Sequence, residues 1–137
     1  MTINFLGLIA AFTAFFSIWF GHVAVRKIEF IAPTISVPST IFAILGIVCE
    51  WLALIAPSLH VATIFGILGI TLLFDGFEFT RQQKRIIKGH APANPDNPRH
   101  AKILVEYSSA TRLDLLKRDP MSLHAPVRNN TGDMEKE

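Results

Sequence analysis

The chain has 137 residues, 50% of them hydrophobic and 18% charged, with a formal net charge of +2. This length fits one small unit. Residues 77 to 137 carry eleven Lys or Arg against eight Asp or Glu. Such a mixed surface excludes the basic stripe typical of nucleic-acid binding, so we expect no nucleic-acid partner. Cys49 is the single cysteine, which excludes an intrachain disulfide and a cysteine-based metal site.

Three long apolar runs occupy residues 3–25, 37–56 and 61–74. A bilayer core about 30 Å thick needs roughly 20 apolar residues in a helix. We therefore predict an all-α fold with three transmembrane helices at about 3–25, 38–56 and 60–88, which together form a membrane domain over residues 1–88. The first run has no basic segment before it, which argues against a cleaved signal peptide.

Small residues form a stripe along one face of each predicted helix. In lipid, helices associate where small residues let their backbones approach closely. The positions that we expect in such contacts, within this bundle or against another protein, are Gly7, Ala14, Gly21, Gly46, Gly66 and Gly69. The opposite face of the first helix carries Phe5, Phe12, Phe16 and Trp19, and either lipid or a partner helix would suit these side chains.

The loop after the first helix, residues 26–37, has an apolar centre. We expect Phe30 and Ile31 to reach down into the lipid there. Pro38, Ser39 and Thr40 resemble a helix start, in which a hydroxyl group accepts from the free backbone N–H groups of the first turn. The second helix is therefore predicted to begin at this point.

Lysine and arginine are distributed unevenly around the predicted helices, and the positive-inside rule converts that asymmetry into an orientation. The N-terminus and the hairpin at 57–60 have none. The basic residues flank the other ends of the helices: Arg26, Lys27, Arg81, Lys84, Arg85 and Lys88. We predict that the N-terminus lies outside and the C-terminal tail in the cytoplasm. The same six side chains would lie at the height of anionic lipid head groups, as specific contacts or as topogenic charges only.

The third helix is predicted to end at Gly89, a typical C-terminal stop. Beyond it lies a tail, residues 89–137, that we expect to lack a core of its own. Pro92, Pro95 and Pro98 are three residues apart, which favours an extended, polyproline-like connector. Residues 102–107 alternate weakly and suggest a strand, and residues 109–118 suggest a short amphipathic helix.

Ionisable side chains within the apolar helices are costly and therefore candidate functional groups. The intramembrane polar residues are Glu50, His22 and Asp75. Glu50 is either a proton or cation site or a protonated carboxyl group that contacts a neighbouring helix or a partner, and we prefer the second interpretation. His22 is level with Asp75, with which it is expected to pair, and it is also the one candidate haem ligand. A second His22 in a homodimer, or a ligand from a partner, would then have to complete the haem site, and no other cofactor and no metal site is predicted.

Several short motifs follow one another along the chain in a defined order and spacing: Gly21-His22, Lys27-Ile28-Glu29-Phe30, Asp75-Gly76-Phe77-Glu78, residues 82–85 and Gly89-His90-Ala91-Pro92-Ala93-Asn94-Pro95. With these motifs the chain resembles, over residues 3–98, a family of small bacterial integral membrane proteins without an assigned function. The resemblance implies a three-helix architecture in the bacterial cytoplasmic (inner) membrane and no known activity. Members of the family usually have an aromatic residue in place of His90 and end soon after the Asn-Pro pair, so the residues beyond 98 are a departure from it.

The serines and Cys49 lack a neighbouring base, and the chain has no glycine-rich phosphate loop, so we expect no enzymatic activity. The first hypothesis is a non-catalytic accessory subunit of a larger membrane complex, such as a respiratory or photosynthetic electron-transfer complex. Its partners would be other integral membrane subunits, the bilayer, and a cytoplasmic surface covered by the tail. The alternatives are a homo-oligomeric proton or cation channel that uses Glu50 and a haem-binding subunit that uses His22.

Overall fold

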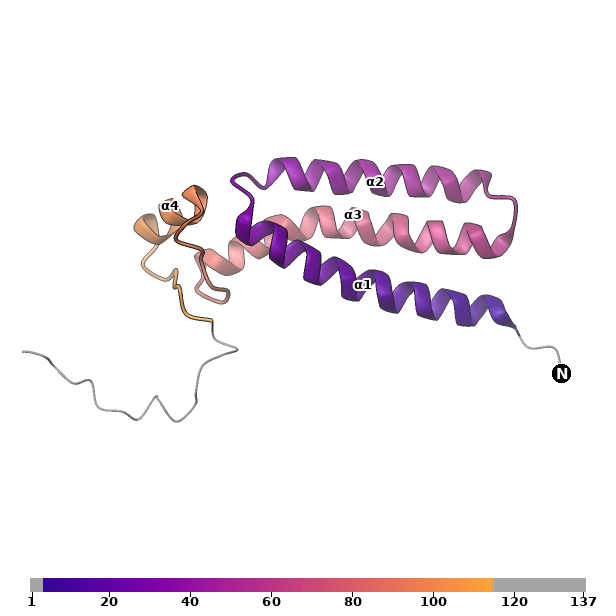
Figure 1. Ribbon diagram of the computed structural model, residues 1–137, viewed down its shortest axis with the longest axis horizontal. Coiled ribbons are helices and arrows are strands. Elements are labelled where there is room, and N and C mark those ends of the chain that lie inside the picture. The colour runs from indigo at the N-terminus through magenta and orange to yellow at the C-terminus, as the bar shows by residue number, and fades with distance from the viewer. Residues whose placement is uncertain (1–3, 115–137) are drawn as a thin grey trace, which may run out of the picture.

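The computed structural model describes residues 4–114 and folds them into helices without a strand (Figure 1). The helices are α1 (Phe5–Ile31), α2 (Ser36–Ile55), α3 (Leu59–Ile87) and α4 (Pro98–Glu106). The first three are long and apolar enough to cross a membrane. The prediction of an all-α fold with three membrane-length helices is thus confirmed, and the protein has a multi-pass membrane architecture.

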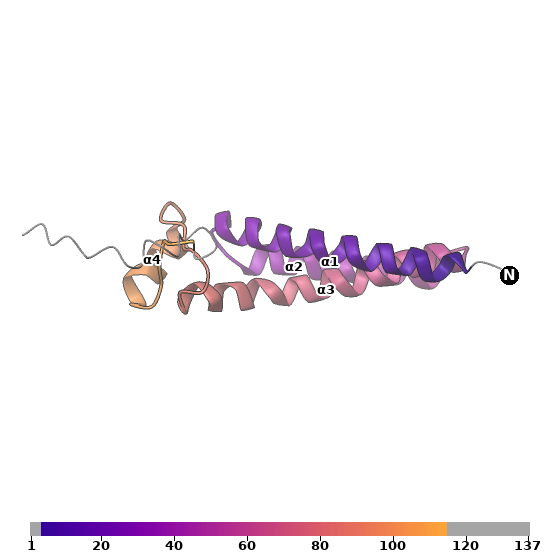
Figure 2. The same cartoon turned by 90° about the horizontal axis from the view of Figure 1, so that it is seen from below.

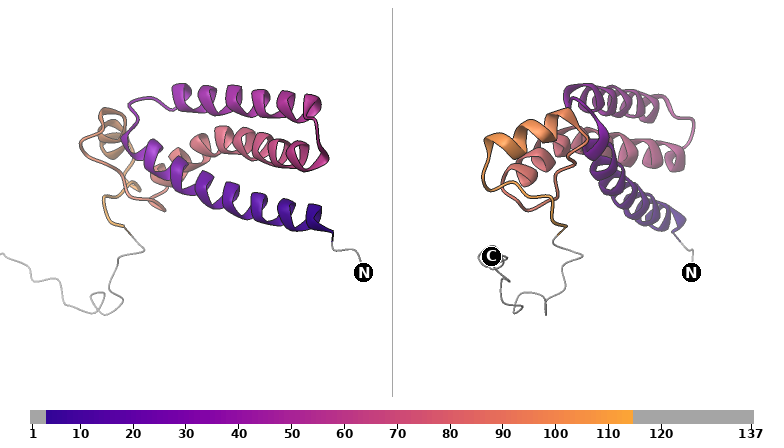
Figure 3. Two further views of the ribbon diagram at one scale, coloured as in Figure 1. Left: turned by 45° about the vertical axis from the view of Figure 1, so that its right-hand side comes forward. Right: turned by 60° about the vertical axis from the view of Figure 1, so that its left-hand side comes forward.

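The three long helices run alternately up and down, and α3 contacts both α1 and α2 (Figure 1). The helix α1 begins at the same end of the molecule as the α2–α3 turn, and we call this the hairpin end. At the opposite end α1 and α3 finish, α2 begins and α4 lies alongside (Figure 2). We call this the basic end, because Arg26, Lys27 and the basic residues of α3 lie there. Towards the hairpin end α1 diverges from α3 (Figure 3).

The helix α1 continues to Ile31, about six residues beyond the end predicted at residue 25. Charged residues such as Arg26 and Lys27 are good helix formers, and a change from apolar to charged side chains marks the membrane boundary and not the helix end. Ala32 adopts an extended conformation because it precedes Pro33, and the residue before a proline is restricted away from the helical region. Phe30 and Ile31 therefore belong to the last turn of α1.

The helix α2 begins at Ser36, two residues before Pro38. The prediction that a hydroxyl group at Pro38-Ser39-Thr40 caps this helix is wrong, because its N-cap residue is Ile35, which makes no side-chain cap hydrogen bond. The Ser39 hydroxyl donates instead to the carbonyl oxygen of Gly76 in α3, at 2.6 Å. This hydrogen bond joins the two helices at the basic end. Phe42 and Phe79 stack edge to face beside it, with ring centroids 5.3 Å apart.

Glycines bring α2 and α3 together along their length. A methyl group added at Gly46 would lie 2.7 Å from Leu73 Cγ and 2.9 Å from the Gly69 carbonyl oxygen. At Gly66 the contact is looser, with Ala53 Cβ at 3.9 Å. Close backbone approach of this kind is what small residues permit in lipid.

The packing of α1 differs between its two ends. A methyl group at Gly21 would overlap the Asp75 carboxyl group, whereas one at Gly7 would meet nothing within 4 Å among residues 4–114. Ala14, between them, is half-buried. The small-residue stripe of α1 is therefore used inside the molecule at one end and open at the other.

The tail differs from the prediction in two ways. The connector is not an extended polyproline segment, because the Asn94 side chain accepts from the Asp96 N–H at 3.0 Å and turns the chain. The predicted strand at 102–107 is also wrong, since these residues belong mainly to α4. Asn97 caps α4 by accepting from the Arg99 N–H at 3.0 Å, and Pro98 is its first residue, where a proline is favoured because its missing N–H would have no partner in the helix.

Residues 89–114 fold back onto the end of α3 (Figure 3). A small apolar cluster unites Ile86 of α3 with Ala91, Ala93 and Ile103. Gly89 follows α3 with φ +72°, a left-handed conformation that glycine adopts without strain. The Ser109 hydroxyl then donates to the Ile87 carbonyl at 2.6 Å. The described part of the helix predicted at 109–118 is irregular, and its remainder lies outside the described residues.

Candidate functional site

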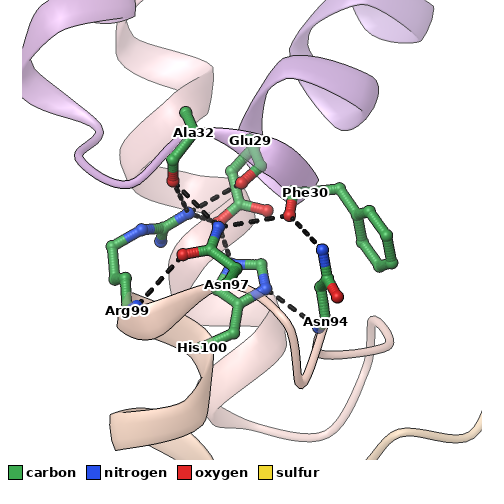
Figure 4. A network of polar contacts seen from close by, with 7 residues as sticks. All are labelled: Glu29, Phe30, Ala32, Asn94, Asn97, Arg99 and His100. Carbon is green, nitrogen blue, oxygen red and sulfur yellow. Dashed lines mark hydrogen bonds and ion pairs between the residues drawn. The ribbon is translucent and has the colours of Figure 1, made fainter.

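A polar network lies at the basic end and is made by Glu29, Asn94, Asn97, Arg99 and His100 (Figure 4). It joins the last turn of α1 to the connector and α4. Residues 64 to 71 positions apart in the sequence meet here. We refer to these five side chains as the polar network.

The network satisfies the free carbonyl groups at the end of α1. The last four carbonyls of a helix have no partner within the helix. Asn97 Nδ2 donates to the carbonyls of Phe30 and Ala32, at 3.2 and 2.9 Å, and Asn94 Nδ2 donates to that of Phe30 at 3.1 Å. Arg99 Nη2 donates to the Glu29 carbonyl at 2.7 Å. Side chains of the tail thus act as the C-terminal cap of α1.

The Glu29 carboxylate lies at the centre of the network, with 1% of its side chain exposed. Arg99 Nη2 is 2.8 Å from Glu29 Oε1, and His100 Nε2 is 3.1 Å from the same oxygen. The other guanidinium nitrogens of Arg99, Nε and Nη1, are buried without a hydrogen-bond partner among residues 4–114. The charge of Arg99 is therefore balanced by Glu29, and a buried ion pair becomes costly when one partner is removed.

The surroundings of His100 determine which of its nitrogens carries the proton in the neutral ring. The Asn94 backbone N–H donates to His100 Nδ1 at 3.0 Å, so Nδ1 is the acceptor and Nε2 carries the proton. Nε2 consequently donates to Glu29. Because His100 is completely buried and both of its ring nitrogens are engaged, this histidine holds the connector and α4 against the end of α1.

A second charged cluster lies along α3. Arg85 Nη2 is 3.0 Å from Glu78 Oε1, an ion pair without hydrogen-bond geometry, and Arg81 Nη1 is 3.6 Å from Glu78 Oε2. Arg85 also donates to Gln82 at 3.2 Å. The charges of Arg81 and Arg85, which we expected at lipid head groups, are thus engaged within the molecule. Lys84 of the same helix and Lys88, the residue that follows its end, are exposed.

The structure brings His22 and Asp75 near each other without a direct bond. Asp75 is buried against Gly21 and within electrostatic reach of His22, which is itself exposed. Residues 4–114 contain no group of three or more His, Cys, Asp or Glu side chains that could hold a metal ion.

Glu50 lies between α2 and α3, where its carboxyl group covers Gly69. Its side chain is half-buried, while Ile47, Trp51 and Leu54 around it are exposed. Within residues 4–114, Glu50 has neither a hydrogen bond nor an ion pair. The absence of Cβ at Gly69 provides the space that this carboxyl group occupies.

A cavity of about 900 Å³ opens beside the polar network. Its walls come from the end of α1, from Gln82 of α3, from the connector and from residues 112–114. Arg26 and Lys27 line it together with Arg112. The basic residues of the first loop and of the tail thus share one surface, although 85 positions separate Lys27 from Arg112 in the sequence.

Comparison with known proteins identifies a family for residues 4–97, described as a domain of unknown function, DUF4491. The chain belongs to the DUF4491 family. This finding agrees with the resemblance to a small family of unassigned function. No curated protein and no solved structure matches the chain. The DUF4491 region includes Glu29, Asn94 and Asn97, and Arg99 and His100 follow directly after it.

Sequence analysis named Glu29 and Asn94 only within the motifs of the family resemblance and did not identify Asn97, Arg99 or His100. For this DUF4491 protein the missed signal is Asn97-Pro98, an N-cap residue followed by a proline at the first helical position. It would have replaced the predicted strand by a helix. That helix places Arg99 and His100 in its first turn, facing the end of α1 (Figure 4).

Proposed function

We propose that this protein is a non-catalytic accessory subunit of a larger membrane protein complex. One observation carries the proposal: within residues 4–114, a methyl group added at Gly7, at the hairpin end of the small-residue stripe of α1, would meet nothing within 4 Å, although the same stripe is closely packed at Gly21. In lipid, small residues in a row are the positions at which helices associate. The open half of α1 is therefore suited to a helix of another subunit.

Aromatic side chains cover much of the rest of this half of α1. Phe12, Phe15 and Phe16 are each more than half exposed. The rings of Phe12 and Phe16 stack, and Phe15 meets Phe16 edge to face. Phe12 and Phe16 lie on the face opposite the small-residue stripe, where lipid suits them as well as a protein partner would, so the support for a partner helix comes from Gly7.

The proposal is tested by the variant Gly7→Leu. The variant protein should insert and fold normally, because there is space at Gly7 within the molecule. After gentle extraction from native membranes, wild-type protein should migrate with a large complex in native electrophoresis, and Gly7→Leu should migrate alone. Phe12→Leu, on the opposite face of α1, is the matched control and should stay in the complex. If Gly7→Leu also co-migrates, the open stripe is not the contact.

The orientation and location are part of the same proposal. Because basic residues flank one end of the bundle, we expect the basic end and the tail in the bacterial cytoplasm and the hairpin end outside the inner membrane. The tail would then cover a cytoplasmic surface of the partner. Deleting residues 115–137 retains every contact described above, so loss of co-purification in that truncated protein would report a contact made by the deleted segment.

A homo-oligomeric channel is the second candidate, and it rests on Glu50. This is the only charged residue between positions 30 and 74, and its half-exposed carboxyl group has no partner among residues 4–114. A proton or cation flux in liposomes that disappears in Glu50→Gln would support a channel. Purified wild-type protein without flux would remove this candidate, and a purified protein without a Soret absorption band would remove haem binding at His22.

A further inference from the structure

The cavity at the basic end lies at the depth of lipid head groups. The charge-free part of α1, from Phe5 to Val25, spans about 30 Å at 1.5 Å per residue, which is roughly the thickness of the hydrocarbon core. Arg26 and Lys27, the next two residues, therefore lie where that core ends. Both line the cavity of about 900 Å³.

The three basic side chains of the cavity differ from other arginines of the basic end. Arg81, Arg85 and Arg99 form ion pairs with Glu78 or Glu29. Within residues 4–114, Arg26, Lys27 and Arg112 have neither an ion pair nor a hydrogen bond from their side chains. Their charges remain available to a ligand.

The acidic groups of the cavity do not cancel this charge. Glu29 lines one wall, but its carboxylate is already bound by Arg99 and His100. Asp114 lies on the wall as well and takes part in an interaction of its own. Three cations against one further carboxylate leave the cavity positive.

The remaining walls of the cavity are apolar. Val23, Phe30 and Ile31 line it from α1, and all three are also exposed on the outer surface of that helix, Ile31 to 69%. The apolar wall is thus continuous with the surface of α1 that faces the surroundings in a membrane. A ligand held here can place a charged group among the cations and an apolar chain along α1.

We propose that this cavity binds one anionic phospholipid. Arg26, Lys27 and Arg112 hold the phosphate and head group, and Val23, Phe30 and Ile31 contact the upper part of an acyl chain. Lys84 and Lys88, which are exposed at the end of α3, do not line this cavity. The proposal does not depend on any partner protein.

The test is native mass spectrometry of the full chain in detergent, titrated with phosphatidylglycerol or with phosphatidylcholine of the same acyl chains. We expect one bound phosphatidylglycerol, with an affinity on the order of tenfold above that for phosphatidylcholine. Arg112→Gln should weaken the binding of phosphatidylglycerol by about fivefold, since each basic residue near an anionic surface contributes about that factor. Arg26→Gln with Lys27→Gln should weaken it further.

Lys84→Gln with Lys88→Gln removes the same charge from the same end of the bundle, outside the cavity, and should change the affinity less than twofold. Arg112→Gln is the most informative of these variants. Because Arg112 follows the three membrane helices in the chain, its substitution leaves the topogenic residues Arg26 and Lys27 unchanged. Equal binding of the two lipids, or equal loss in the cavity and control variants, would overturn the proposal. Complete competition by inorganic phosphate would also overturn it, in favour of a site for a soluble anion.

Discussion

The two ends of the bundle are built on different principles. Within residues 4–20 and 40–70, which form most of the hairpin end, only Gly46 and Gly69 are buried. The basic end buries large apolar side chains, Phe79, Ile86 and Val25, together with the polar Glu29 and His100. Three helices of similar composition thus hold together without a core at one end and around a core at the other.

The difference follows from the two solvents. In lipid an exposed leucine or phenylalanine costs nothing, and helix contacts depend on close backbone approach. Where the chain leaves the hydrocarbon and enters water, burying apolar side chains away from the water stabilises the fold. Polar groups that become buried there need hydrogen-bond partners. The basic end therefore resembles a small water-soluble domain attached to a membrane hairpin, and the polar network is what attaches it.

The largest effect is expected from Glu29→Ala, which would destabilise the packing of the tail at the basic end and leave the three long helices folded. The variant leaves Arg99 buried and without its ion-pair partner, and it also removes the acceptor of His100. We expect a loss of about 3–5 kcal/mol of local stability. Limited trypsin digestion in detergent should then cut rapidly at Arg99 and Lys102, while the three long helices stay intact.

The matched control for this experiment is Glu106→Ala, which removes an exposed carboxylate from the end of α4. It should leave the digestion rate within about twofold of the wild type, as expected for a surface substitution worth no more than ~0.5 kcal/mol. Equal protection of Glu29→Ala and Glu106→Ala would mean that the polar network does not hold the tail.

Effects of intermediate size on the free energy of unfolding are expected from alanine substitutions at two glycines, Gly46 and Gly7. The two substitutions should act in opposite directions. In Gly46→Ala the new methyl group meets the Gly69 carbonyl oxygen at 2.9 Å, which should cost about 1–3 kcal/mol through overpacking. In Gly7→Ala it meets nothing, and the better helix propensity of alanine should stabilise α1 by up to about 1 kcal/mol. Unfolding by SDS titration, followed by circular dichroism, measures both. Destabilisation of the monomer by Gly7→Ala would contradict the open stripe.

The smallest effect is expected from Ser39→Ala, which removes the side-chain hydrogen bond to Gly76 at the junction of the two regions. Hydrogen bonds between membrane helices are worth about 0.6 kcal/mol on average, so the midpoint of SDS unfolding should decrease only slightly. Ser36→Ala, at the exposed first residue of α2, provides the comparison. A loss above 2 kcal/mol in Ser39→Ala would show that the contact has a larger role than one hydrogen bond.

Prediction from the sequence succeeded where one residue pattern reflects one physical requirement. The length and apolarity of the three runs predicted three membrane-length helices, because a helix is the one way for a single segment to satisfy its backbone in lipid. The end of α1 was predicted too early, because a change of polarity at Arg26 does not stop a helix, whereas Pro33 does. The tail was predicted incorrectly for a similar reason, since the prolines were interpreted by their spacing and not by the Asn97 cap that precedes Pro98.

The sequence by itself determined the membrane class, the three helices and the concentration of basic residues at one end, since these depend on composition and local order. Only the tertiary structure decided that Glu29 meets Arg99 and His100, that Arg112 joins Arg26 and Lys27 around one cavity, and that the stripe on α1 is filled at Gly21 and open at Gly7. Such contacts join residues far apart in the chain, and their existence depends on the angle between helices and on the path of a connector. Neither is encoded in a local pattern.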